Sequence, residues 1–331
     1  MDVVTVLSIK IILTIYKRVF VWLIIQKKII FGFVFFLVLL YNCFARDKAI
    51  VEKKDGAMFW EMTGTDKNGN ESKVYILGTF HAGDDRLYPL PQFVLDAYDN
   101  ADIVCGEIST QGWEELQSVL ISKMASDMLD SESHLDQFLT EEEVALTYEY
   151  LGAQAPYMFL YKPWVLNQVI SSFILSETDM DFVDAYDSFF IARSNDRGIN
   201  MEGLDSVERQ IDCLSYGDFD FQLVALKGSF EAIENPEETV ENFLNLYEAY
   251  LSFDEKVMEE AYFKEIETEI NEYEGFKGYY DVLLVERNKD WAVTIDNYLN
   301  EGGTTFIFAG TGHFIGDDSV FNFMRANGTL K

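Results

Sequence analysis

The chain has 331 residues, of which 49% are hydrophobic and 15% aromatic, and its formal net charge is −32. This composition supports a sizeable core, in one large domain or two ordinary ones. The negative charge argues against nucleic acid as a partner, because phosphate binding requires clustered Lys and Arg. It favours a soluble, self-repelling surface.

The first 45 residues differ from the rest, because they carry a net charge of +4. An uninterrupted apolar run at residues 29–41 follows Lys27 and Lys28 and precedes the small residues Cys43 and Ala45. This order is typical of an export signal. Residues 1–45 are therefore predicted to be an export signal, or a membrane anchor through residues 29–45 if uncleaved. The remainder is then periplasmic, cell-surface or secreted.

Two alternatives remain open for this segment. The first 25 or so residues are unusual for a signal and are explained by a start codon assigned too early. Cys43 suggests a lipoprotein as the second alternative, although bulky and polar residues precede it where small ones are needed. The polar residues 46–56 are predicted to be a linker, and residues 57–331 a single domain.

Short apolar runs in the remainder indicate strands. Residues 58–62 and 73–77 flank a turn-rich segment and predict a hairpin. Residues 103–105, 199–202 and 304–309 predict three more strands. These runs are short, mostly not alternating, and separated by helical stretches, which indicates an α/β sheet covered on both faces.

Helix signals dominate the middle of the chain. A capping box at residues 140–143 and Pro163 each predict a helix start. Further helices are predicted at residues 181–193, in two pieces across 237–274 that divide near residues 252–254, and at 279–299 and 319–326. A large helical block is therefore inserted between the strands of a central mixed sheet.

Two of the three histidines lie in the same local sequence. His81 ends Gly78-Thr-Phe-His and His313 ends Gly310-Thr-Gly-His, and each motif follows an apolar strand. Gly78, Gly310 and Gly312 allow tight turns and close approach of the backbone to a ligand. His134 lies in a polar segment and is predicted to be a surface residue.

Glu107 ends a third apolar strand, at the edge of the sheet where open α/β folds bind ligands. His81, His313 and Glu107 together predict a His₂Glu set that leaves one position of a metal open for water. Such a metal lowers the pKa of its water and polarises a carbonyl. The pattern suits zinc, manganese and cobalt. The alternative is a structural histidine and an exposed loop carboxylate.

These segments resemble the TraB/PrgY/GumN family, which includes the Tiki proteases. The resemblance runs through Tyr75-Ile-Leu-Gly-Thr-Phe-His81, then Ala101-Asp-Ile-Val-Cys-Gly-Glu107, Lys162-Pro-Trp164, the segment 203–210, Arg287-Asn288 and the stretch 310–328. It implies the α/β fold of erythromycin-esterase-like and haem-binding ChaN-like proteins. It also implies that the paired Gly-x-x-His motifs and the early glutamate map onto His81, His313 and Glu107.

The resemblance further implies an activity, since Tiki proteins are metal-dependent proteases that cut an extracellular peptide. We therefore expect an exported metal-dependent hydrolase acting on a peptide or a small molecule. Arg287, with Asn288 beside it, is expected to stabilise transition-state charge; an ion pair with Glu286 or another acidic neighbour is the alternative. Asp205 stands where many relatives have Glu, which withdraws a candidate catalytic carboxylate by about 1.5 Å.

Two rival functions stay open at this point. One is an esterase on the same fold that uses a histidine as base without a metal. The other is a non-enzymatic surface protein that holds haem or a metal between the two histidines.

Overall fold

The computed structural model describes residues 47–130 and 132–331. The chain divides into two units, Met1–Asp47 and Lys48–Lys331, and the strands and helices with defined bounds all belong to the second. The predicted export signal or anchor therefore lies outside the described residues. Within the described ranges, no helix has the length and apolar character needed to span a membrane.

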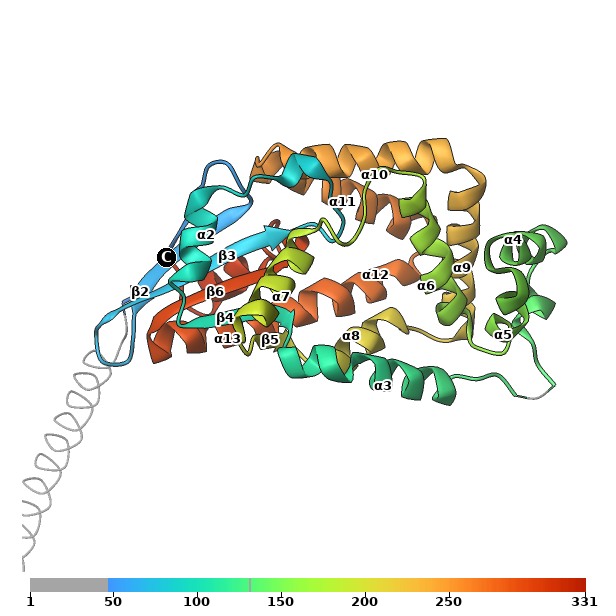
Figure 1. Cartoon of the computed structure of the whole chain (residues 1–331), viewed down its shortest axis with the longest axis horizontal. Helices are drawn as coiled ribbons and strands as arrows, with labels where there is room; N and C mark the ends of the chain where they lie inside the picture. Colours follow the sequence, from blue (N-terminus) through green and yellow to red (C-terminus); the bar gives the residue numbers. More distant parts are fainter. Residues whose placement is uncertain (1–46, 131) are drawn as a thin grey trace, which may run out of the picture. The chain divides into compact units, whose positions relative to one another are not determined.

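A mixed sheet of six strands forms the centre of this unit, in the order β1-β2-β3-β6-β4-β5 (Figure 1). The strands β1, β2 and β3 pair antiparallel, whereas β3, β6, β4 and β5 are parallel. The prediction of a central mixed sheet is confirmed. The strand bounds are β1 Ile50–Lys54, β2 Phe59–Thr65, β3 Glu71–Thr79, β4 Ile103–Ile108, β5 Glu202–Asp205 and β6 Gly303–Gly310.

Strand β1 lies within the segment 46–56 that was predicted to be a linker. All five of its residues pair with β2, and Ala49 before it is fully buried. As an edge strand, β1 is held by backbone pairing, and its side chains stay half-buried or exposed. A run with so little apolar character gives no strand signal in the sequence.

Strand β5 also differs from its prediction at residues 199–202. The backbone N–H of Ile199 donates to Ser194 O, and that of Met201 donates to the Thr110 hydroxyl. These residues therefore close the preceding helix and fix the loop. Pairing with β4 begins at Glu202.

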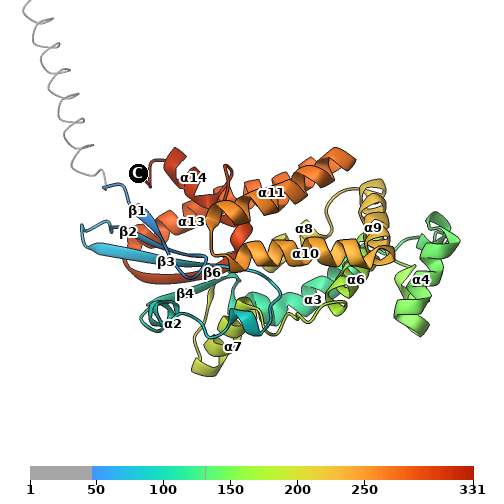
Figure 2. The ribbon, with the colours of Figure 1, turned by 90° about the horizontal axis from the view of Figure 1, so that it is seen from above.

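Helices cover both faces of the sheet, as predicted (Figure 2). On one face lie α2 (Gln92–Asp99) and α7 (Tyr186–Arg197), and on the other lie α13 (Arg287–Glu301) and α14 (Val320–Ala326). Phe190 of α7 packs on Phe306 of β6 with ring centroids 5.0 Å apart, and Trp291 of α13 is fully buried. Each such side chain contributes about 1.5–3 kcal/mol of burial free energy.

The remaining helices form the predicted inserted block, which extends from the carboxyl ends of the parallel strands (Figure 1). Its own apolar cluster joins α6 to α9 through Leu166, Ile170, Leu226 and Phe230. The bounds are α3 Thr110–Ser126, α4 Glu141–Leu151, α5 Ala155–Met158, α6 Pro163–Ser176, α8 Val207–Leu214, α9 Phe219–Glu234, α10 Pro236–Leu251, α11 Glu255–Glu272 and α12 Gly275–Tyr280. Short 3-10 helices are η1 Asp85–Leu87, η2 Leu135–Phe138, η3 Gly152–Gln154 and η5 Thr311–His313.

Several helix predictions match and two shift. The capping box at Thr140 forms, and α10 and α11 divide where expected. Helix α7 starts later than predicted because Asp181 pairs through its backbone with Gly83. The helix predicted at 279–299 is instead α12, a π-helix η4 (Asp281–Glu286) and α13, and a π-helix is frequent at functional sites.

Candidate functional site

The two histidine motifs stand at the same level of adjacent parallel strands. Thr79 at the end of β3 pairs with Gly310 at the end of β6. His81 follows β3 directly, and His313 ends the 3-10 helix η5 that follows β6. Glu107 lies on β4, which is the other neighbour of β6. Parallel strands thus deliver all three side chains to one edge of the sheet.

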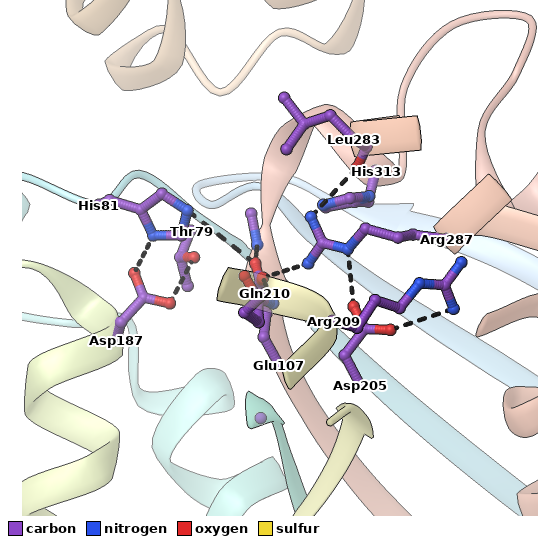
Figure 3. Close-up of polar contacts among 12 residues, drawn as sticks. Thr79, His81, Glu107, Asp187, Asp205, Arg209, Gln210, Leu283, Arg287 and His313 are labelled. Atoms are coloured by element: carbon purple, nitrogen blue, oxygen red, sulfur yellow. Dashed lines mark hydrogen bonds and ion pairs between the residues drawn. The ribbon is translucent and has the colours of Figure 1, made fainter. Parts of the chain in front are cut away.

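Figure 3 shows His81, Glu107 and His313 near one another, and Gly310 lies close to all three. A Cβ atom placed on Gly310 would lie 3.3 Å from Glu107 Oε1, 3.5 Å from His81 Nε2 and 3.7 Å from His313 Cδ2. His81 Nε2 is 4.0 Å from Glu107 Oε1. A side chain at position 310 would therefore fill the centre of the site.

The glycines of the motifs serve close packing. None of Gly78, Gly310 and Gly312 has a positive φ, unlike Gly316 with φ +77°. A Cβ on Gly78 would lie 2.6 Å from the Thr311 hydroxyl, and one on Gly312 would lie 2.7 Å from Tyr262 Cζ. Glycine at Gly78 and Gly312 is therefore explained by close contact with protein side chains, and close approach to a ligand stays a prediction.

Glu107 is a partly buried carboxylate, 15% exposed, with three donors. Its Oε1 accepts from Gly310 N–H at 2.9 Å, and its Oε2 accepts from Arg287 Nη2 at 2.7 Å and Gln210 Nε2 at 2.9 Å. Burial opposes its charge, but His313, His81 and Arg287, with the Gly310 N–H, hold the pKa of Glu107 well below its usual range. The group is therefore a permanent anion.

Arg287 joins two carboxylates on neighbouring strands. Its side chain is 3% exposed, and Nε donates to Asp205 Oδ2 at 2.6 Å while Nη1 donates to Leu283 O at 3.1 Å. Burial lowers the pKa of Arg287, and Glu107 and Asp205 raise it above its ordinary value. The ion pair that the sequence left as the alternative is present, with Glu107 and Asp205 as its partners, and the role in stabilising transition-state charge stays a prediction.

Asp205 is a buried partner of Arg287. Its side chain is 1% exposed, and its second oxygen is 3.4 Å from Arg209 Nη1. It does not line the cavity that opens over the two histidines. The shorter side chain at this position therefore bears on how Arg287 is held.

His81 is tied to a carboxylate that the sequence did not indicate. Its Nδ1 is 3.3 Å from Asp187 Oδ2 in α7, and the Thr79 hydroxyl donates to Asp187 Oδ1 at 2.8 Å. Packing around the ring lowers the pKa of His81, but Asp187 and then Glu107 raise it to about 9. The side chain is 65% exposed, so solvent weakens each of these effects.

His313 has the opposite environment. It is 5% exposed, it packs on Trp291 with ring centroids 4.1 Å apart, and its Nδ1 is 2.6 Å from Asn288 Oδ1. Asn288 Nδ2 donates to Asp318 O, which turns the amide oxygen toward the ring. Nδ1 therefore carries the proton and Nε2 is a free acceptor. Burial, chiefly, lowers the pKa of His313 to about 3.

A cavity of about 600 Å³ opens above these groups; we name it the site cavity. Its floor includes Glu107, Arg287 and the two histidines. Its walls come from α6, α8, α10, α11 and η4 of the helical block and from the loops that carry Phe80, Ala82 and Phe182. Two imidazoles and a carboxylate at the floor of a pocket are arranged for proton transfer.

Comparison with known proteins identifies the family. Residues 58–330 match the TraB/PrgY/gumN family. The chain belongs to the TraB/PrgY/gumN family. It is similar to a Treponema pallidum (strain Nichols) protein named "Uncharacterized protein", at 27% identity over 83% of this chain and 82% of that one. No solved structure matches the chain.

A metal in this TraB/PrgY/gumN protein requires a converging donor set. In residues 47–130 and 132–331, no group of three or more His, Cys, Asp or Glu side chains is arranged to hold a metal ion. Both oxygens of Glu107 already accept hydrogen bonds, one of them from the cationic Arg287. The groups as they stand do not fit a His₂Glu metal centre.

Three residues of the site carry no functional signal in the sequence. Asp187 and Tyr262 lie on helices with no motif around them. Gln210 belongs to the family-like segment 203–210, which predicts no contact with Glu107. Asn288, expected to act beside Arg287, is instead 1% exposed and bonded to His313. His134 is exposed, as predicted.

Proposed function

We propose that this family member is a hydrolase that uses its two histidines as an acid–base pair. The observation that carries the proposal is that two imidazoles line one cavity in opposite environments: His81 is exposed beside the Asp187 carboxylate, and His313 is buried beside the Asn288 amide oxygen. These environments shift the two pKa values in opposite directions. Such a separation assigns an acid and a base to one site. His81 is the proton donor, and His313 is the acceptor.

The chemistry follows from the hydrogen bonds. His313 Nε2 takes a proton from a water, whose oxygen attacks the substrate carbonyl carbon. His81 Nε2–H donates to the leaving oxygen or nitrogen as its bond to carbon breaks. Asp187 and Glu107 stabilise the His81 imidazolium before transfer, and exchange with solvent then returns both rings to their starting states.

Hydrolysis by the full chain tests this proposal. On p-nitrophenyl butyrate, His81→Gln and His313→Gln should each lower kcat/KM by about 10²–10⁴-fold, the usual contribution of a general acid or base. His134→Gln, which changes an exposed histidine outside the site, should match the wild type. The wild-type rate should fall above pH 9 as His81 loses its proton. Equal rates in all four proteins would refute the proposal.

A metal-dependent hydrolase, such as the peptidase that the resemblance implies, is the second candidate. One observation favours it: both rings contact an oxygen atom through Nδ1, as metal-bound histidines do, and both residues line the cavity. A chelator separates the candidates. Activity that persists in chelator supports the acid–base pair, whereas loss that zinc, manganese or cobalt restores supports the metal.

Export and a binding role remain predictions. Cell fractionation, with N-terminal sequencing of the mature chain, tests whether residues 1–45 direct export or anchoring. A Soret band that appears on adding haem, and is lost in His81→Gln, would support the haem-binding alternative.

A further inference from the structure

The walls of the site cavity differ in chemistry from its floor. The wall side chains are mostly apolar and come from five elements: Leu175, Leu214, Phe243, Met258, Leu283 and Leu284. The wall residues Ser171 and Ser172 donate their hydroxyls to carbonyls of their own helix, Gln168 O and Val169 O. The space above the catalytic floor is therefore apolar.

Helical walls also limit how a peptide could bind. An extended peptide gains affinity by adding its backbone to an exposed strand edge. Most wall residues lie on α6, α8, α10, α11 and η4, whose backbone groups are bonded within the helices. Apart from the loops at Phe80, Ala82 and Phe182, the walls therefore offer side chains alone to a ligand.

The floor has no uncommitted Lys or Arg for a charged substrate group. Arg287, the one Lys or Arg among the described residues that line the cavity, uses Nε, Nη1 and Nη2 on Asp205, Leu283 and Glu107. Glu107, beside it, is anionic. A carboxylate on the substrate would meet this anion and would compete with Asp187 and Glu107 for the His81 imidazolium, and a charged group is costly to place among apolar walls.

Tyr262 supplies a neutral donor at the border of floor and walls. A Cβ on Gly312 would lie 2.8 Å from the Tyr262 hydroxyl, so this phenol sits against the second histidine motif. Its hydroxyl makes no hydrogen bond to the described residues. Burial raises the pKa of the Tyr262 phenol, which keeps it protonated and able to donate.

We propose that the site cavity takes an ester or amide of an uncharged, apolar acyl group, with the acyl chain between the helices and the carbonyl oxygen at the Tyr262 hydroxyl. This inference rests on the proposed hydrolase. Water adds its oxygen to the acyl carbon, the bond from that carbon to the alcohol oxygen or amine nitrogen breaks, and His81 protonates the leaving group. The products are the carboxylic acid and an alcohol or amine.

Acyl-chain length is the first test, with p-nitrophenyl esters of two, four and eight carbons and the full chain. Four additional buried methylenes should raise kcat/KM from butyrate to octanoate by on the order of 10²-fold. Leu175→Trp narrows the cavity and should reduce this preference. The matched Ile121→Trp substitution, on a residue 57% exposed in α3, should keep it. A wild-type rate that is flat with chain length, or that falls, overturns the proposal.

Binding without turnover separates this proposal from the proposed function. Octanamide is neutral and carries the same acyl chain, and calorimetry should show it binding to the wild type and to His313→Gln, with acetamide and octanoate weaker. Tyr262→Phe should weaken octanamide by about 2- to 10-fold through one lost hydrogen bond. Octanamide that binds without ester hydrolysis would refute the hydrolase and retain the cavity assignment. Hydrolysis of short esters or peptides with no octanamide binding would refute the cavity assignment and retain the hydrolase.

Discussion

The two histidines show how one local sequence acquires two chemistries. His81 and His313 each follow a strand and a glycine-containing turn, yet His81 is largely exposed beside Asp187, and His313 is buried against Trp291. The difference comes from what α7 and α13 place beside each ring. A carboxylate partner favours the imidazolium, and burial beside an amide oxygen favours the neutral ring.

Imidazole NMR tests this difference directly, because the chain has only three histidines. We expect the His81 ring to titrate near pH 9 and the His313 ring to stay neutral, with the proton on Nδ1, down to about pH 3. Asn288→Asp places a carboxylate on Nδ1 and should raise the pKa of His313. His134→Gln assigns the remaining signal. A His313 ring that protonates near its ordinary value of 6.5 would contradict the buried, amide-bonded environment.

The raised pKa of His81 also determines in which direction the stability of the fold changes with pH. A pKa that is higher in the folded chain than the ordinary 6.5 gives stabilisation that is complete below pH 6.5 and is lost as pH rises through about 9. Asp187→Asn should flatten this part of the stability curve in urea unfolding.

At the scale of elements, the hairpin of β2 and β3 depends on one aspartate. Asp66 Oδ1 accepts the backbone N–H groups of Asn68 and Asn70, each at 2.8 Å. The hydrogen bonds from Asn70, side chain first and then backbone, lower the pKa of Asp66 from 3.8 to about 2. The turn therefore closes best when this carboxylate is charged.

A carboxylate whose pKa is lowered by folding stabilises the fold at pH values above its ordinary pKa. This stabilisation is lost as the pH falls through the pKa of the folded state. The stability difference between the wild type and Asp66→Asn should thus be constant above about pH 4 and narrow toward pH 2. Urea unfolding across pH 5 to 2.5 measures it. Glu114→Gln, on an exposed helix position, controls for losing one negative charge. A difference that widens on acidification would refute the role of Asp66.

The sequence predicted the elements that have strong local signals. It did not predict the elements whose bounds depend on backbone hydrogen bonds to other segments. The hairpin, β6, α4, α6 and the break between α10 and α11 all followed from apolar runs, a capping box, Pro163 and a polar interruption. Strand β1 was missed because an edge strand with charged side chains is stabilised by its partner's backbone. The start of α7 was misplaced because Asp181 bonds to Gly83, a contact that is distant in sequence.

At the scale of the whole molecule, the charge of −32 opposes compaction. Raising NaCl from 10 to 150 mM shortens the screening length from about 30 to about 8 Å. We expect the Tm to rise by a few degrees, since about 1 kcal/mol corresponds to about 2–4 °C for a domain of this size. KCl and LiCl at equal ionic strength distinguish general screening from binding of one cation. A Tm that stays level or falls with salt would contradict net self-repulsion.

The sequence by itself determined the α/β class, the family resemblance and the identity of the histidines and glutamate, because these depend on local periodicity and on motifs in order. It also predicted that strand ends would carry the site, since parallel strands end at one edge of a sheet. Tertiary structure alone decided which neighbours each group has: Asp187 beside His81, Asn288 beside His313, and Arg287 between Glu107 and Asp205. The acid–base character of the site arises from these neighbours, because a pKa depends on burial and nearby charge, and segments far apart in the chain supply both.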